Sequence, residues 1–118
     1  MRPKDYGFYL EDILGAIEKI ERYIEGVTFE HFSQDGKTVD AVLRNLEIIG
    51  EATKMIPEKM RSRFPSIPWK DMAGMRDRLI HKYFAVALDV VWKTLITRLP
   101  NVKLLIEEAL DEIEKSPN

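Results

Sequence analysis

The chain has 118 residues, of which 45% are hydrophobic and 32% charged, and a formal net charge of −2. This composition is typical of one folded domain and excludes a disordered chain, so we expect a single domain over residues 1–118. The absence of cysteine excludes disulfide scaffolds, thiolate nucleophiles and cysteine-bound zinc. No apolar run approaches the roughly 20 residues that cross a bilayer, and the opening segment lacks the apolar stretch of a secretory signal. We therefore expect a cytoplasmic protein without a membrane span.

Apolar residues recur every three or four positions over residues 6–24, which predicts an amphipathic helix that ends at Gly26. Residues 28–37 keep no sustained period and predict a connection with about one turn of helix. A second helix is predicted over residues 38–56. Pro57 then interrupts this helix or begins a short one, because proline lacks the N–H that continues a helix.

Two prolines within residues 65–68 predict a loop, and a third helix is predicted from there over residues 69–83. A fourth helix is predicted from about Leu88. Pro100 fits the first turn of a fifth segment that keeps the helical period. Since no segment alternates long enough to demand a strand, the expected fold class is all-α, an up-and-down bundle of four to five helices.

Charge is unevenly distributed along the chain. Residues 54–82 contain eight basic and three acidic residues, a local balance of +5, whereas the rest of the chain carries −7. Such a segment can present a surface that attracts anions such as nucleic acid, although solvated lysines and arginines on helix faces would give the same pattern.

The most specific local pattern is R-x4-H-x-Y, formed by Arg76, His81 and Tyr83. Arginine is a permanent planar phosphate-binding cation and histidine titrates near neutrality, so the pair can clamp a phosphate and move a proton without a metal or cofactor. At about 100° per residue the two positions lie about 140° apart on one helix. Either the helix distorts near His81 or two copies of the motif combine across a dimer. Asp77, four residues before His81, can orient its imidazole.

Structural explanations stay open at this point. His81 could be packed at the edge of the core, and Tyr83 could be a core aromatic with its hydroxyl bonded to backbone.

Three segments carry a family resemblance: RNLEIIGEATKMIP over residues 44–57, IPWKDMAGMRDRLIHKYF over 67–84 and DVVWKTL over 89–95. In order and spacing they strongly resemble the HEPN-domain toxins of the HepT-like family. This resemblance implies an all-helical HEPN bundle that forms a homodimer. It further implies a metal-independent endoribonuclease, a toxin encoded beside a nucleotidyltransferase antitoxin.

The resemblance also assigns roles to the motif residues. It makes Arg76 and His81 the catalytic residues, Asp77 the polar residue that follows the arginine, and Tyr83 the side chain to which the antitoxin transfers AMP. The substrate is expected to be RNA, and no metal or cofactor is expected.

Asn45 and Glu51 resemble polar residues that line the cleft of the family, although either could be structural. Lys82, Ala85 and Ala87 stand where Gly, Gly and Asp are common in the family. These departures concern the turn after the motif and leave the catalytic residues in place. The alternative function is a non-catalytic HEPN protein whose cleft binds a nucleotide or scaffolds the nucleotidyltransferase.

Overall fold

The computed structural model describes residues 6–81 and 87–115, without the side chains of Arg76 and residues 78–81. Over these ranges the chain is helical apart from short turns and contains no strand, which confirms the all-α prediction. None of the helices within these ranges is long and apolar enough to cross a membrane. The elements are α1 (Gly7–Ile24), α2 (Phe29–Gln34), α3 (Gly36–Lys54), α4 (Glu58–Arg63), α5 (Trp69–His81), α6 (Leu88–Lys93), the π-helical segment η3 (Thr94–Arg98) and α7 (Leu99–Lys115).

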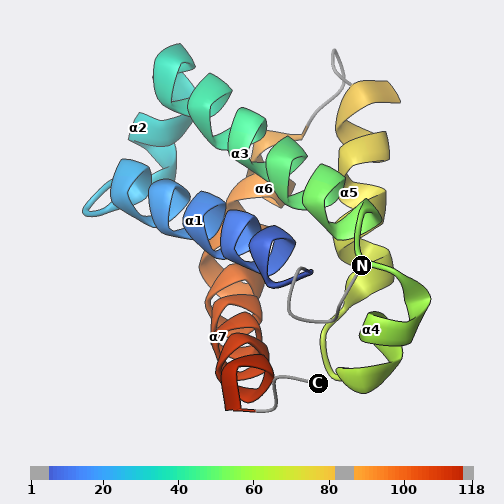
Figure 1. Ribbon diagram of the computed structural model, residues 1–118. Coiled ribbons are helices and arrows are strands. Elements are labelled where there is room, and N and C mark those ends of the chain that lie inside the picture. Colours follow the sequence, from blue (N-terminus) through green and yellow to red (C-terminus); the bar gives the residue numbers. More distant parts are fainter. Residues whose placement is uncertain (1–5, 82–86, 116–118) are drawn as a thin grey trace.

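Four long helices make the bundle. In Figure 1, α1 and α3 lie side by side and run in opposite directions, while α5 and α7 cross them. α5 packs on α3, and α7 packs on α1. The short helices lie at the two ends of α3: α2 connects α1 to α3, and α4 connects α3 to α5. This arrangement fixes α5, the helix that carries the motif positions, against α3.

The core lies between the long helices because each presents one apolar stripe at helical spacing. In α1 the buried positions follow one another at steps of three residues, except for the adjacent Ala16 and Ile17, and they form the single stripe that the sequence predicts. The most deeply buried apolar side chains come from α1, α2, α3, the turn after α3, and α7: Leu10, Ile13, Ile17, Ile20, Phe32, Val42, Leu46, Ile49, Ile56 and Ile106.

The connection between the first two long helices is more helical than the sequence predicts. It forms α2, and the side chain of Thr28 caps this helix by accepting a hydrogen bond from the backbone N–H of His31 at 3.2 Å. α3 begins at Gly36, two residues earlier than predicted, because Asp35 caps it. Gly26 has a φ of 71°, as expected for a left-handed helix terminator.

The C-terminal part of the chain differs from prediction. Instead of separate fourth and fifth helices, α6, η3 and α7 form one uninterrupted helical run. Pro100 lacks an N–H and its ring clashes with the carbonyl group four residues earlier in a regular α-helix. Directly before it, the backbone N–H of Leu99 bonds to the carbonyl of Thr94, five residues back. The wider π turn therefore lets the helix continue through Pro100.

Two polar contacts attach α4 and its loop to the neighbouring helices. The Trp69 indole N–H, at the start of α5, donates to the carbonyl oxygens of Arg61 at 3.1 Å and Phe64 at 2.9 Å. The Arg61 guanidinium donates to the carbonyls of Thr53 at 2.8 Å and Ile56 at 2.9 Å. Because Thr53 lies at the end of α3, these bonds link the end of α3 to the start of α5 through α4.

Candidate functional site

The motif positions Arg76 and His81 both lie in α5, whose backbone stays helical through His81. The offset of about 140° between the two positions is therefore kept in the described helix. Their side chains lie outside the description, as do Tyr83, Lys82 and Ala85. Ala87 is exposed and precedes the first residue of α6.

Asp77, the residue after the motif arginine, is fixed by a contact between helices. Its Oδ1 accepts a hydrogen bond from the Nζ of Lys54, the last residue of α3, at 2.6 Å. The two side chains are 51% and 37% exposed, so the ion pair is solvated and contributes little to stability. What it does is fix the position of the Asp77 carboxylate beside α3.

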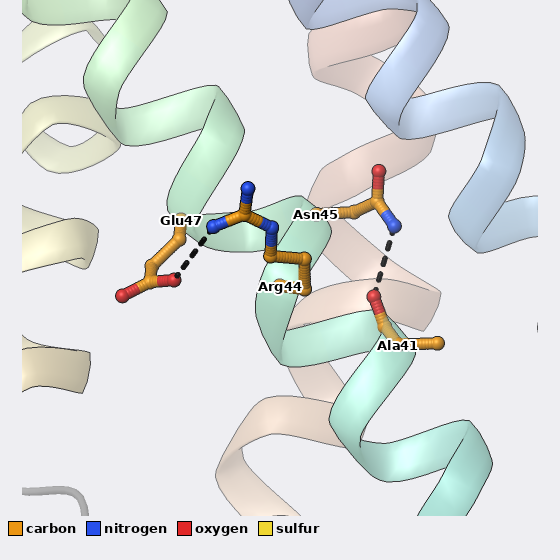
Figure 2. Close-up of polar contacts among 4 residues, drawn as sticks. All are labelled: Ala41, Arg44, Asn45 and Glu47. Atoms are coloured by element: carbon orange, nitrogen blue, oxygen red, sulfur yellow. Dashed lines mark hydrogen bonds and ion pairs between the residues drawn. The ribbon is translucent and has the colours of Figure 1, made fainter.

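Asn45 is 5% exposed and lies on the packed side of α3. Its Nδ2 donates to the carbonyl oxygen of Ala41, one turn earlier in the same helix, at 2.9 Å. In Figure 2 the Asn45 amide lies on one side of α3, toward the ribbon of α1, and the Arg44–Glu47 ion pair lies on the other. This hydrogen bond gives the buried amide a partner within its own helix.

Glu51 is exposed and lies about 120° around α3 from Asn45. The structure therefore does not bring these two predicted site residues together. Glu51 instead shares a polar face with Lys54, three residues later, which contacts Asp77 of α5.

Sequence reasoning missed Lys54 as a neighbour of the motif. It is separated from Asp77 by 23 residues, and nothing in its local sequence distinguishes it from other exposed lysines. Only the packing of α3 against α5 reveals the contact.

A cavity of about 310 Å³ opens beside α5, between α3, η3 and α7. Met75, the residue before Arg76, is among its lining residues, so the cavity adjoins the motif. Arg98 and Asp71 also line it, with 3.8 Å between Nη1 and Oδ2. In the described part of the chain, no three His, Asp or Glu side chains are grouped as a metal ion would require.

Comparison with known proteins places this helical bundle in a family. The sequence profile of the family described as "Ribonuclease HepT-like" matches residues 13–109. No solved structure gave a significant match.

Relatives with ribonuclease names match most of the chain. A protein of Methanocaldococcus jannaschii named "Putative RNase MJ0127" is 42% identical over 114 residues, which cover 97% of this chain and 94% of the relative. The "Probable ribonuclease HepT" of Thermococcus cleftensis is 53% identical over 95 residues, 80% of this chain and 86% of its own. "Putative RNase TTE0752" of Caldanaerobacter subterraneus is 40% identical over 104 residues, 88% of this chain and 93% of its own. Together with the profile match, these identities show that the chain belongs to the ribonuclease HepT-like family and that its all-α bundle is of the HEPN type.

Proposed function

We propose that this protein is a metal-independent endoribonuclease, the toxin of a HEPN and nucleotidyltransferase toxin–antitoxin pair, with residues 1–118 as a single HEPN domain. The observation that supports this most is that Arg76 and His81 lie in one helix, α5, inside the segment that matches the ribonuclease family. The pair supplies a fixed cation and a group that titrates near neutrality, which are what metal-free phosphodiester cleavage requires.

In the proposed reaction, the ribose 2′-oxygen attacks the neighbouring phosphorus and the bond to the 5′-oxygen breaks. Arg76 binds the phosphate oxygens and stabilises the charge that develops on them. His81 takes the proton of the 2′-hydroxyl or delivers one to the leaving 5′-oxygen. The products are a 2′,3′-cyclic phosphate end and a 5′-hydroxyl end.

The offset of about 140° between the two positions supports a site shared by two copies of the chain. In a symmetric dimer, the arginine of one protomer and the histidine of the other can face one phosphate. The contact of Lys54 with Asp77 supports a positioning role for both residues, because it holds the motif helix at the residue next to Arg76.

Cleavage of a labelled RNA pool in the presence of a chelator tests the enzyme assignment. His81→Ala should lower the turnover number by about 10²-fold or more, because it removes the group that moves the proton. Arg76→Lys keeps the charge but loses the planar fork, and it should lower turnover at least about tenfold.

The control for these variants is His31→Ala, which changes an exposed histidine of α2 and should cleave like the parent. Equal rates for the parent and His81→Ala would refute the catalytic assignment. Binding of RNA or nucleotide without cleavage by the parent would favour the non-catalytic HEPN scaffold instead.

Control by the partner enzyme is proposed to act at Tyr83, which follows His81 by two positions in the R-x4-H-x-Y motif. The nucleotidyltransferase would join the Tyr83 phenol oxygen to the α-phosphorus of ATP, with pyrophosphate as the leaving group and the phenol proton lost to solvent. Each added AMP brings a negative charge and bulk near the site that receives the RNA backbone. Binding of RNA should therefore be blocked without unfolding.

The test is to mix the protein with its neighbouring nucleotidyltransferase and ATP, then measure the intact mass and the rate of RNA cleavage. The parent should gain AMP and lose activity, and Tyr83→Phe should do neither. Tyr23→Phe, at a tyrosine of α1 that is 40% exposed, is the matched control and should behave like the parent. Full cleavage by the modified protein would exclude this mechanism and leave the ribonuclease assignment standing.

A further inference from the structure

Gly74 stands in the middle of α5, and nothing among the described residues requires a glycine at this position. A Cβ built on it meets no atom within 4 Å, and its φ is not positive, so neither crowding nor a left-handed backbone calls for glycine. In a helix interior, glycine is less favourable than alanine because it loses more backbone entropy on folding. Because glycine destabilises this helix and no described contact requires it, we infer that a molecule bound from outside needs the space that a Cβ would occupy.

Gly74 belongs to a polar stripe of α5, on the face opposite the one that packs against the bundle. Lys70, Gly74, Asp77 and His81 occupy positions within about 60° of one another around the helix axis. The described members of this stripe are accessible, since Lys70 and Asp77 are exposed and Gly74 is half-buried. From Lys70 to His81 the stripe is about 16 Å long, which matches roughly five nucleotides at the axial spacing of one nucleic-acid strand.

Charge along this stripe favours an anion. The two acids beside Gly74 are each neutralised by a cation from another element: Asp71 lies 3.8 Å from Arg98, and Asp77 lies 2.6 Å from Lys54. Within the described residues, Lys70 has no acidic partner, so its charge is uncompensated there. Gly74 lies within the basic segment of residues 54–82, which contains eight basic and three acidic residues, a balance of +5.

Gly15, which lies in α1, is as open as Gly74 but lies in a helix of opposite charge. α1 contains two basic and four acidic residues, a balance of −2, and α7 contains two and five, a balance of −3. A phosphate backbone is attracted to the region around α5 and repelled by α1 and α7. The open glycine alone does not identify a ligand, but its position in the basic region does.

We propose that the backbone of the bound RNA strand crosses α5 at Gly74, between Lys70 and the position of His81. This inference rests on the proposed ribonuclease function and adds to it the path of the substrate. The missing Cβ lets the sugar–phosphate chain approach the helix closely, and Lys70 neutralises a phosphate upstream of the catalytic histidine. The contact is to the sugar–phosphate backbone and not to bases, so it does not depend on the sequence of the strand.

Gly74→Ala in the full-length protein is the decisive variant. Alanine strengthens the helix, so the midpoint of thermal unfolding should rise by about 2 to 5 °C. The added methyl group should nevertheless raise the KM for RNA about tenfold, with kcat within about twofold of the parent. Gly15→Ala is the matched control: it should give a similar thermal gain and an unchanged KM.

The charge on the path is tested separately by the dependence of RNA binding on salt. Lys70→Gln should reduce the slope of log affinity against log salt by about 0.7, the value for one phosphate contact to a single strand. Lys19→Gln removes an exposed lysine from α1 and should leave the slope unchanged.

The outcomes separate this inference from the proposed function. If the parent cleaves RNA and Gly74→Ala cleaves with the same KM, the path over Gly74 is wrong and the ribonuclease assignment stands. A Gly74→Ala protein with a lower molar mass in solution would show that a second copy, and not RNA, approaches this glycine. Absence of cleavage by the parent would remove both proposals together.

Discussion

At the scale of single residues, side chains cap helix ends in the described part of the chain. Asp35 accepts hydrogen bonds from the backbone N–H of Thr38 at 3.3 Å and from its hydroxyl at 2.6 Å. Both bonds lower the pKa of the Asp35 carboxyl below its ordinary value of 3.8, and the bond from the hydroxyl has the larger effect. A carboxyl whose pKa is lower in the folded state stabilises that state above its unfolded pKa and loses this contribution as pH falls.

Asp35→Asn should therefore change the acid stability of the protein. Asparagine caps helices about as well as aspartate but does not titrate, so the variant should match the parent near neutral pH. As pH falls below 3.8 toward the lowered pKa of Asp35, the parent should lose stability that the variant keeps. Thermal unfolding followed by circular dichroism between pH 2 and 7 measures this difference. Parallel curves for the two proteins would contradict the assigned role of the carboxylate.

At the scale of secondary-structure elements, α4 connects the two helices that form the candidate site. Arg61 supplies donors to carbonyl groups at and after the end of α3, and its own carbonyl accepts from the Trp69 indole at the start of α5. The Thr53 carbonyl also accepts from the backbone N–H of Ile56 at 3.1 Å, so the guanidinium adds a charged donor to a helix end that the backbone satisfies only in part. The spacing of α3 and α5, and with it the Lys54–Asp77 contact, depends on this short helix.

Arg61→Met should lower the free energy of unfolding by about 1 to 3 kcal/mol, because two partly buried carbonyls lose a charged donor. Denaturant unfolding measures this change. The control is Arg63→Met on the same helix, whose guanidinium lies 5.3 Å from the centre of the Phe64 ring. That contact is worth about 0.5 to 1 kcal/mol, so the control should be milder. A smaller loss for Arg61→Met than for Arg63→Met would show that α4 does not depend on the carbonyl contacts.

At the scale of the whole molecule, the charge distribution and the motif geometry both point to assembly. Acidic α1 and α7 pack on one another, whereas the basic stretch over residues 54–71 leads into α5. Several large apolar side chains are more than half exposed, including Phe8, Met55, Val90 and Leu104. A symmetric dimer would cover part of this surface and bring two motif helices to one cleft.

The expected assembly is a homodimer, with a molar mass in solution twice the 13.8 kDa of one chain. Light scattering after size-exclusion chromatography at micromolar concentration gives this mass directly. A monomer under these conditions would rule out the shared site. Arg76 and His81 of one chain would then have to reach the same phosphate despite their offset of about 140° around the helix.

Most of the fold follows from local sequence. The helical period places α1, α3, α5 and the C-terminal helices within a few residues, because each needs an apolar stripe to bury. Gly26 terminates a helix as predicted, since glycine reaches a positive φ without steric cost. The family also follows from sequence, because three segments match it in order.

The tertiary structure alone determined how distant residues combine. Pro100 was predicted to begin a new segment, but a π turn lets one helix continue through it. Asn45 and Glu51 looked alike in the sequence, but Asn45 is buried and Glu51 is exposed. Lys54 and Asp77 are brought together across 23 residues by the packing of α3 on α5. Periodicity reports which face of a helix is buried, but not which neighbour buries it, since that choice is made by contacts between segments far apart in the chain.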